Sequence, residues 1–420
     1  GRGLSFIRVQ GLKSLQGKIE IQGSKNAVLP IMAAALLHKG MVVIKNVPRI
    51  QDVFCMLEIL KALGCSYQFE GHELTLDTRD LCSYKVPERE GRQMRSSVML
   101  LGPLLGRLHQ AWTCYPGGCV IGKRPIDLHL SALEKLGAKI EPKEDGIFVT
   151  GERLSGTDVH LLFPSVGATE NVLMAGAAAR GTTRIFGAAK EPEIQTLCDF
   201  LNRLGAKVCG IGTDVLTVEG KNTFQDVEFT VPGDRIVAGT YLGAVMAAGG
   251  EICLTGVPVR HMEGTLDVVR KTGCQVEAWG EEIRAFMRGR PLPVQVCTGP
   301  YPEFSTDLQS VMLSVAAVAE GNSQIQENVF EERFATGKEL QKLGTQIIIK
   351  DRTAFVTGRY PLKGGEVYAL DLRGGAALTV AGLAAEGESR IHGCFYICRG
   401  YEDICRDLSA VGARVSMEEE

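Results

Sequence analysis

Positively charged side chains recur along the chain just before runs of small apolar residues. Such runs are typical of buried helices, so these cations are expected at helix starts: Lys25, Arg95, Arg235 and Arg373. A helix start exposes free N–H groups and carries about half a positive charge, which makes a cation there unfavourable by itself. A bound anion reverses the balance, because the N–H groups, the dipole and the cation then all attract it. The pattern predicts a phosphate or carboxylate site, with solvated first-turn residues as the alternative at any single position.

Two further expected helix starts carry polar residues without a cation, at Ser165 to Asn171 and at Thr306-Asp307. The carboxylate of Asp307 allows two interpretations. It is either an ordinary helix cap that accepts hydrogen bonds from backbone N–H groups, or a carboxylate that takes part in chemistry at the anion site. The sequence leaves both open.

One segment, from Cys114 to His129, contains three glycines and two prolines and is expected to form a turn-rich loop, a common location for function. Within it, Cys119 follows a glycine pair and precedes Lys123 and Arg124. Nearby cations lower the pKa of a thiol and make it more reactive. Cys119 is therefore the cysteine most suited to catalysis, and structural burial is the expectation for the other twelve.

Several common cofactor motifs are missing from the sequence. No phosphate-binding loop of the ATPase type is present, and Gly210-Ile211-Gly212 lacks the third glycine of a dinucleotide fingerprint, so it more simply turns a hairpin. The seven histidines include no His-x-x-x-His pair, and Cys394 with Cys398 lacks further ligands at zinc-like spacing. Neither ATP, a dinucleotide nor a structural metal is expected.

Composition narrows the class of protein. The 420 residues carry a net charge of -3 from 46 basic and 49 acidic side chains, which gives no large basic field for nucleic acid or an anionic membrane. No apolar run approaches the roughly 20 residues of a membrane-spanning helix, and the first residues lack the apolar core of a signal peptide. Thirteen scattered cysteines indicate reduced thiols. We expect a cytoplasmic protein without disulfides.

A glycine signature returns six times, at Gly64, Gly137, Gly205, Gly273, Gly344 and Gly412. Successive members are 73, 68, 68, 71 and 68 residues apart, by difference of their numbers. A fixed period of this size indicates that one structural unit was copied. An amphipathic helix precedes each glycine, which is then expected to end it in a left-handed conformation, and two short strands follow.

Each repeat also contains a helix that is apolar nearly all round and rich in small residues, as a buried helix must be. Examples are the segments Ala27 to Leu37, Val172 to Ala179, Ile236 to Ala248, Leu308 to Ala319 and Ala376 to Ala385. The repeat is predicted to run helix, strand, helix, strand, strand, with the sheet outside and the small-residue helix inside.

Six repeats divide naturally into two domains of three. The expected crossing points are Gln22-Gly23-Ser24 and Val231-Pro232-Gly233-Asp234, because each precedes a small-residue helix at a half boundary. One domain would span 23–232 and carry the cysteine loop. The other would be discontinuous, 1–22 plus 233–420, with the first strands packed against the second half of the chain.

The segments that carry these features resemble a known family, the UDP-N-acetylglucosamine 1-carboxyvinyltransferases. The similar segments are Gly23 to Ala27, Pro116 to Pro125, Pro164 to Asn171, Pro232 to Arg235, Phe304 to Gln309 and Arg399 to Glu402. The resemblance implies an α/β protein, a two-domain inside-out α/β barrel with its active site in the cleft. It also implies transfer of the enolpyruvyl group of phosphoenolpyruvate to the 3-hydroxyl of UDP-N-acetylglucosamine, with release of phosphate. This is the first committed step of peptidoglycan synthesis, and the family requires no metal or organic cofactor.

The same resemblance implies roles for individual residues. Phosphoenolpyruvate would be bound by Lys25, Asn26, Arg95, Arg124 and Arg399, and Cys119 would protonate its methylene carbon. The uridine diphosphate end would lie on Arg124, Pro125, Ile126, Asp127 and Leu128, and on Ser165, Val166 and Gly167. Asp307 would accept the proton of the sugar hydroxyl, Val329 would line the pocket, and Arg373 would complete the substrate-binding set. The residues expected to act in catalysis are Cys119, Asp307, Lys25 and Arg399.

The chain departs from the family pattern near these positions. Glu332 stands where Asn is common, Ala335 lies where a His is usual after Phe334, and Cys398 replaces the Asp before Arg399. These departures motivate a second hypothesis, an impaired paralogue that binds UDP-sugar and regulates or scaffolds a partner. A shikimate 3-phosphate enolpyruvyl transferase is a third, and the cysteine loop argues against it.

An epoxide phosphonate that resembles phosphoenolpyruvate is expected to alkylate Cys119, because the cationic loop would bind its phosphonate next to the thiol. Peptide mass spectrometry after incubation checks this. An adduct on any other cysteine, or no adduct, contradicts the assignment of Cys119.

Overall fold

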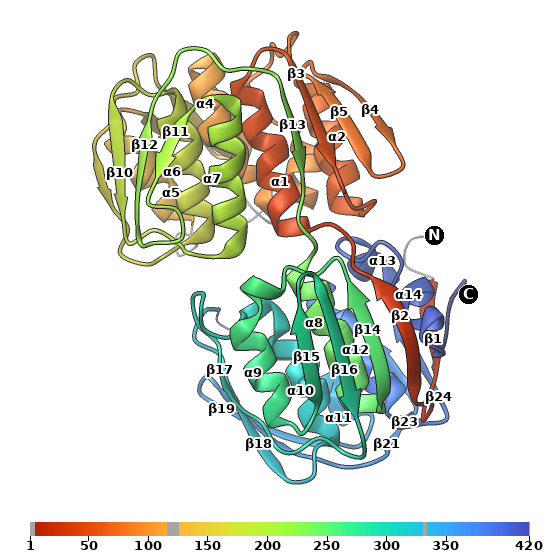
Figure 1. The fold of residues 1–420 in the computed structure, drawn as a ribbon. Coiled ribbons are helices and arrows are strands. Elements are labelled where there is room, and N and C mark those ends of the chain that lie inside the picture. Colours follow the sequence, from red (N-terminus) through yellow and green to blue (C-terminus); the bar gives the residue numbers. More distant parts are fainter. Residues whose placement is uncertain (1–4, 116–125, 331–333, 420) are drawn as a thin grey trace. The chain divides into compact units, whose positions relative to one another are not determined.

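The structure is a computed structural model that describes residues 5–115, 126–330 and 334–419 (Figure 1). It divides into two compact units. The continuous unit is Gly23–Val231, and the discontinuous unit is Gly1–Gln22 with Pro232–Glu420. Each has its own hydrophobic core.

The continuous unit contains three sheets, ordered β13-β3-β5-β4, β6-β8-β7 and β11-β12-β10-β9. Its strands are β3 Met41–Lys45, β4 Ser66–Glu70, β5 Glu73–Asp77, β6 Gln110–Cys114, β7 Lys139–Pro142, β8 Gly146–Thr150, β9 Asp158–His160, β10 Thr182–Phe186, β11 Lys207–Cys209, β12 Val215–Glu219 and β13 Val227–Thr230. Its helices are α1 Lys25–Ala34, α2 Gln51–Ala62, α3 Glu88–Gln93, α4 Leu101–Leu108, α5 Ile126–Lys135, α6 Val166–Ala178 and α7 Pro192–Leu204, with 3₁₀ turns η1 Ala35–Leu37 and η2 Arg95–Leu100.

The discontinuous unit contains sheets ordered β15-β16-β14-β2, β17-β18-β20-β19 and β22-β24-β1-β25, and the short pair β21-β23. Its strands are β1 Ser5–Gln10, β2 Leu15–Glu20, β14 Gly250–Thr255, β15 Gln275–Trp279, β16 Glu282–Met287, β17 Gln295–Cys297, β18 Asn322–Gln326, β19 Gln346–Lys350, β20 Thr353–Thr357, β21 Leu362–Lys363, β22 Glu366–Tyr368, β23 Ala385–Glu386, β24 Glu388–His392 and β25 Arg414–Glu419. Its helices are α8 Arg235–Ala248, α9 Glu263–Lys271, α10 Gln309–Val318, α11 Ala335–Gln341, α12 Leu372–Leu383, α13 Cys394–Cys398 and α14 Ile404–Ala410, with η4 Val259–His261 and η5 Thr306–Leu308.

Five of these sheets share one pairing pattern, three antiparallel strands with one parallel strand at an edge. The sheet β6-β8-β7 has three strands, and a single parallel bridge between Lys85 and Trp112 lies where the parallel edge strand would be. In the discontinuous unit, β1 pairs with β24 and β25, and β2 pairs with β14. Strand β1 thus completes a sheet formed by the last third of the chain, and β2 completes a sheet formed by its middle.

The small-residue helices are buried on all sides, as their composition predicts. Every residue of α10 and α12 is buried, and so is every residue of α8 except Ala248. Helices that lack a polar face have no surface to offer water, so they lie inside and the sheets lie outside. Within the discontinuous unit, α8, α10 and α12 pack on one another (Figure 1). The charged side chains of these helices, Arg235 and Arg373, consequently lie in their first turns.

The helix starts differ from the prediction at two places. Arg95 begins the 3₁₀ turn η2, and α4 starts six residues later; Asp307 likewise lies in the 3₁₀ turn η5 ahead of α10. Pro103 accounts for the first case, because it donates no backbone hydrogen bond and is best accommodated in the first turn of an α-helix, where α4 places it. Both residues are therefore on tighter turns than an α-helical first turn.

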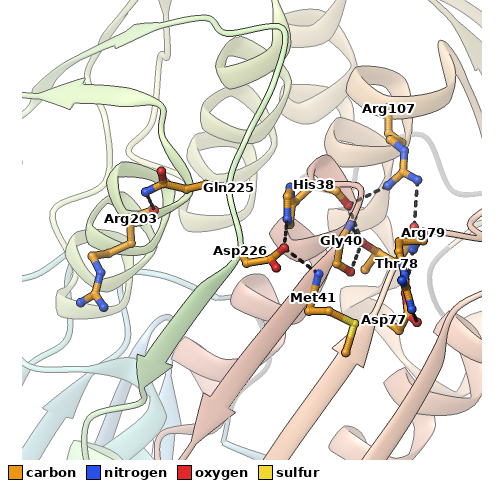
Figure 2. Close-up of polar contacts among 10 residues, drawn as sticks. All are labelled: His38, Gly40, Met41, Asp77, Thr78, Arg79, Arg107, Arg203, Gln225 and Asp226. Atoms are coloured by element: carbon orange, nitrogen blue, oxygen red, sulfur yellow. Dashed lines mark hydrogen bonds and ion pairs between the residues drawn. The ribbon is translucent and has the colours of Figure 1, made fainter.

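A polar network ties the end of the continuous unit to its beginning (Figure 2). Asp226, just before β13, accepts a hydrogen bond from the backbone N–H of Met41 at 2.9 Å and lies 2.6 Å from Nε2 of His38. The hydrogen bond with His38 lowers the pKa of Asp226. Arg107 donates to the carbonyl oxygens of His38 and Thr78 at 2.7 and 2.8 Å. The last strand, β13, is thereby fixed beside the first, β3.

The sequence also predicts reduced cysteines and no membrane-spanning helix. All twelve cysteines of the described ranges are free thiols. No helix among the residues that the structure describes is long and apolar enough to cross a membrane.

The predicted left-handed conformation of the six signature glycines is confirmed, with φ between 89° and 114°. Gly64 and Gly205 have nearly the same φ, 113° and 114°. A Cβ on Gly205 would meet nothing within 4 Å, whereas one on Gly64 would lie 2.5 Å from the carbonyl oxygen of Asp80. Replacement of Gly205 by alanine would therefore cause backbone strain alone, whereas replacement of Gly64 would add a steric clash.

We expect G205A to lower the free energy of unfolding by about 1–3 kcal/mol through backbone strain alone. G64A should cost clearly more, because a backbone carbonyl must also move. Urea unfolding followed by circular dichroism measures both. Equal losses in the two variants would show that the clash at Gly64 relaxes at no cost.

Candidate active site

A capped helix start follows each of the two points at which the chain passes from one unit to the other. Ser24 accepts a hydrogen bond from the N–H of Ala27 at 3.2 Å ahead of α1, and Asp234 accepts from the N–H groups of Ile236 and Val237 at 2.9 and 3.0 Å ahead of α8. The preceding glycines approach a backbone carbonyl so closely that a Cβ on either would lie 1.8 Å from its oxygen. Glycine is required there, and the next residue after each cap is the cation predicted from the sequence, Lys25 or Arg235.

Lys25 is paired with a carboxylate that the sequence did not single out. Its Nζ lies 3.0 Å from Oδ2 of Asp52 in the first turn of α2, and the two side chains are 14% and 5% exposed. Asp52 was overlooked because an acidic residue in a first helical turn is ordinarily explained by the helix dipole. Lys25 is therefore a largely buried cation held by a buried counter-ion at the start of α1.

Arg373 and Asp307 lie together in the discontinuous unit. Nη2 of Arg373 is 3.7 Å from Oδ2 of Asp307. Burial alone would lower the pKa of Arg373, but Asp307, Tyr401 and Asp234 outweigh it and the pKa is raised. The guanidinium is therefore permanently charged beside the carboxylate, an arrangement that favours an ionised Asp307.

The interpretation of Asp307 as an ordinary helix cap is wrong. The cap of this turn is Ser305, whose Oγ accepts a hydrogen bond from the backbone N–H of Asp307 at 3.1 Å. The backbone of Asp307 is thus fixed by Ser305, while its carboxylate lies near Arg373. This leaves the carboxylate for the role in chemistry that the sequence also allowed.

Glu327 joins two of the predicted site segments and was missed by the sequence analysis. It is 1% exposed. One carboxylate oxygen accepts from Oγ1 of Thr306 at 2.9 Å, and the other accepts from the N–H groups of Val329 and Phe330 at 2.9 and 3.0 Å. Glu327 therefore fixes the turn that carries Asp307 relative to Val329. No sequence motif indicates this role, because a glutamate at the end of a strand is common.

Arg399 lies at the end of the short helix α13. The turn that follows it is held by hydrogen bonds to Gln22. The side chain of Gln22 donates to the carbonyl of Gly400 at 2.9 Å and accepts from the N–H of Glu402 at 3.0 Å. The backbone carbonyl of Gln22 accepts from the N–H of Asp234 at 2.8 Å. One glutamine thus connects the Arg399 turn to the start of α8.

In the continuous unit, Asn171 connects the start of α6 to its neighbours. Its Oδ1 accepts from the N–H of Gly102 at 2.8 Å, which fixes the amide orientation. Its Nδ2 then donates to the carbonyl of Val98 at 3.1 Å and to Nδ1 of His129 at 2.8 Å. Because Nδ1 accepts, the neutral ring carries its hydrogen on Nε2. Ser165, Val166 and Gly167 begin this same helix.

His129 packs against the first turn of α6. A Cβ on Gly167 would lie 2.5 Å from the ring, so only glycine allows the contact. Burial lowers the pKa of His129 to about 4. Its neighbours Ile126, Asp127 and Leu128 occupy the first turn of α5, so the ring links two segments predicted to bind the same ligand.

The structure places the predicted residues in two groups. The continuous unit carries Lys25, Asn26, Arg95, Ile126, Asp127, Leu128, Ser165, Val166 and Gly167, and the discontinuous unit carries Asp307, Val329, Arg373 and Arg399. Cys119, Arg124 and Pro125 lie outside the described residues, as does the departure at Glu332. Each group is gathered at starts of buried helices and adjoining turns.

Two departures from the family pattern have local explanations: Cys398, and Gly374, which follows Arg373 where alanine or serine is more typical of the family. A Cβ on Gly374 would lie 2.4 Å from Oγ1 of Thr336, so the hydroxyl of Thr336 fills the space of the missing side chain. Cys398 is a half-buried thiol whose pKa is raised by burial and by Asp403. Neither change introduces an unpaired charge near Arg399.

Comparison with known proteins decides the family. The sequence profile described as EPSP synthase (3-phosphoshikimate 1-carboxyvinyltransferase) matches residues 9–408. The chain belongs to the EPSP synthase family.

Within the EPSP synthase family, the chain is 43% identical over 410 residues to UDP-N-acetylglucosamine 1-carboxyvinyltransferase 2 of Caldanaerobacter subterraneus, covering 97% of this chain and 98% of that protein. It is 41% identical over 411 residues to UDP-N-acetylglucosamine 1-carboxyvinyltransferase of Corynebacterium jeikeium, with 98% of each covered. Among solved structures, the enolpyruvyl transferase NikO from Streptomyces tendae superposes with a TM-score of 0.91 at 24% identity, covering all of both chains. EPSP synthase from Acinetobacter baumannii gives 0.74 at 17%, covering 99% of this chain and 100% of that one. The expected α/β class is confirmed, and the fold is that of the enolpyruvyl transferases.

Within the described ranges, no three His, Cys, Asp or Glu side chains are grouped so that they could hold a metal ion. The polar groups gathered at the helix starts are instead cations, carboxylates and backbone N–H groups, which suit anionic organic ligands.

The pKa of His129 predicts a pH effect on stability. The unfolded chain protonates this histidine near pH 6.5 and the folded chain near pH 4, so the unfolded state binds more protons between these values. Stability is therefore lost as pH falls through this window, by about 3 kcal/mol at most. We expect H129Q to remove this loss.

The comparison must be between wild type and H129Q, because burial raises the pKa of Glu170 to about 8 and acts in the opposite direction. Stability from Glu170 falls as pH rises from about 4.5 to 8 in both proteins and cancels in the difference. Thermal unfolding at pH 4.5 and 7 measures it. Parallel pH dependences in the two proteins would contradict the assignment.

Proposed function

We propose that this chain transfers the enolpyruvyl group of phosphoenolpyruvate to the 3-hydroxyl of UDP-N-acetylglucosamine and releases phosphate. The observation that carries the proposal is the similarity, at 41 to 44% identity and 97% or more of the chain, to proteins named UDP-N-acetylglucosamine 1-carboxyvinyltransferase. The reaction is a step of peptidoglycan synthesis and takes place in the cytoplasm. It needs only small-molecule substrates, and neither a metal nor an organic cofactor.

The architecture proposed for this activity is the two-domain inside-out α/β barrel of six repeats, three in each domain. The continuous and discontinuous units are these domains, and the active site forms where the helix starts of both contribute. The shared pairing pattern of five sheets and the common conformation of the six signature glycines support this proposal.

Phosphoenolpyruvate carries a phosphate and a carboxylate, so its binding requires several cations. We assign this role to Lys25, Asn26, Arg95, Arg124 and Arg399. The nucleotide lies on Arg124 to Leu128 and on Ser165 to Gly167. His129, which follows Leu128, contacts Asn171 and Gly167 and so holds the start of α5 against the start of α6. Val329 lines the sugar pocket.

The chemistry requires an acid and a base. Cys119 donates its proton to the methylene carbon of phosphoenolpyruvate, which leaves a cationic centre at the neighbouring carbon. The sugar oxygen attacks that carbon while Asp307 accepts its proton, and Arg373, 3.7 Å away, stabilises the carboxylate before the transfer. Loss of phosphate and return of a methyl proton to the Cys119 thiolate then restore the double bond and give the enol ether product. Lys25 and Arg399 stabilise the departing phosphate.

Two other functions remain as outcomes of the test. The departures at Glu332, Ala335 and Cys398 support one of them, a paralogue that binds UDP-sugar and does not turn it over. The other is the shikimate 3-phosphate reaction, by which the family profile is described.

Phosphate release from phosphoenolpyruvate is expected with UDP-N-acetylglucosamine as acceptor and not with shikimate 3-phosphate. Removing the acid in C119S should lower kcat by about 10²–10⁴-fold. C209S, in which an exposed strand cysteine is changed in the same way, should retain full activity. A colorimetric phosphate assay measures all four conditions.

Each other result has a definite meaning. Release only with shikimate 3-phosphate would show that the chain is a shikimate 3-phosphate enolpyruvyl transferase. Nucleotide binding by calorimetry without release from either acceptor would select the paralogue. Full activity of C119S would refute the role of the thiol while leaving the reaction intact.

A further inference from the structure

The side chain of Gln22 bonds to a turn that lies 378 positions further along the chain. Gln22 is the last residue of the first segment of the discontinuous unit. Its Nε2 donates to the carbonyl of Gly400 at 2.9 Å, and its Oε1 accepts from the N–H of Glu402 at 3.0 Å. Both partners are backbone groups between α13 and α14, so one amide holds two points of the turn that follows Arg399.

These partners determine how the amide of Gln22 is oriented. A backbone carbonyl can only accept and a backbone N–H can only donate, so Nε2 must face Gly400 and Oε1 must face Glu402. The reversed amide would place two acceptors together at one end and two donors together at the other. The side chain therefore has one orientation that forms both bonds.

The turn needs contacts of this kind because α13 is too short to fix it. The helix has five residues, and a helix of that length is not stable by itself. Arg399 and Gly400 donate their N–H groups to carbonyls three residues earlier, at 3.3 and 3.1 Å. Those bonds close the turn on itself, whereas the bonds to Gln22 attach it to a distant part of the unit.

Gln22 is itself held on both sides by its backbone. The N–H of Ile21 donates to the carbonyl of Thr255, the last residue of β14, at 2.8 Å. The carbonyl of Gln22 accepts from the N–H of Asp234, the cap of α8, at 2.8 Å. The side chain thus extends from a position that a strand end and a helix start both fix, and it can impose that position on the turn.

We propose that Gln22 is a positioning residue that holds Arg399 where it meets the phosphate of phosphoenolpyruvate. The inference rests on the proposed function, in which Arg399 binds phosphoenolpyruvate and stabilises the departing phosphate. Gln22 does not touch the substrate; it acts through the backbone of the residues that follow Arg399. Without the amide, the turn loses two bonds to the rest of the unit, and the guanidinium spends less time in the position that the phosphate requires.

The variant Q22M removes both hydrogen bonds and keeps the length of the side chain. We expect it to lower kcat/KM for phosphoenolpyruvate about tenfold, which corresponds to the net contribution of about one hydrogen bond. The KM for UDP-N-acetylglucosamine should stay within about twofold of wild type, because Arg399 is assigned to the other substrate. Steady-state phosphate release with each substrate varied in turn measures both.

The matched control is N202L, because Asn202 is an amide that bridges two backbone groups in the same way. In the last turn of α7, its Nδ2 donates to the carbonyl of Val208 at 3.2 Å and its Oδ1 accepts from the N–H of Val208 at 2.7 Å. Neither α7 nor β11 carries a predicted site residue. We expect both variants to lower the thermal unfolding midpoint, and N202L to keep the wild-type kcat/KM.

A second measurement does not depend on turnover. The ¹⁵Nε–¹Hε signal of Arg399, assigned with R399K, is expected to shift in Q22M and to stay in place in N202L. Failure of the proposed function is seen as no phosphate release by the wild type, and the arginine signal then still decides whether Gln22 positions Arg399. An unchanged signal in Q22M, a kcat/KM for phosphoenolpyruvate within about twofold of wild type, or an equal loss in N202L overturns the proposal.

Discussion

A helix that is buried on every side has only its ends available for charged groups, and the structure follows from this constraint. The helices α8, α10 and α12 are covered over almost their whole length, and the first-turn cations Arg235 and Arg373 lie at the starts of α8 and α12. Packing in the interior and chemistry at the helix starts therefore depend largely on different residues. The two meet at residues such as Asp234 and Arg373.

Much of the scaffold could be predicted because it depends on local rules. The signature glycines require a backbone conformation that other residues rarely adopt, and all six have it. The composition of the small-residue helices predicts burial without any knowledge of partners. Lys25 and Arg373 could be identified as helix-start cations for the same reason, since caps and dipoles act within one turn.

The contacts of those residues could not be predicted, because they join segments distant in sequence. Asp52 pairs with Lys25, Glu327 connects the Asp307 turn to Val329, and Tyr401 reaches Thr240 across 161 positions. A buried glutamate or tyrosine has no local signature that distinguishes it from a surface one. The cap interpretation of Asp307 failed in the same way, since a serine two residues earlier already filled that role.

The pairing of β1 with β24 and β25 has a consequence for how the chain acquires its structure. Residues Ser5 to Gln10 find their partners in Glu388–His392 and Arg414–Glu419, which are made much later during synthesis. On the ribosome, the continuous unit can fold while both edges of this strand are still unpaired. An unpaired strand edge can pair with other chains, so the discontinuous unit protects its first strand only after its last strands have been made.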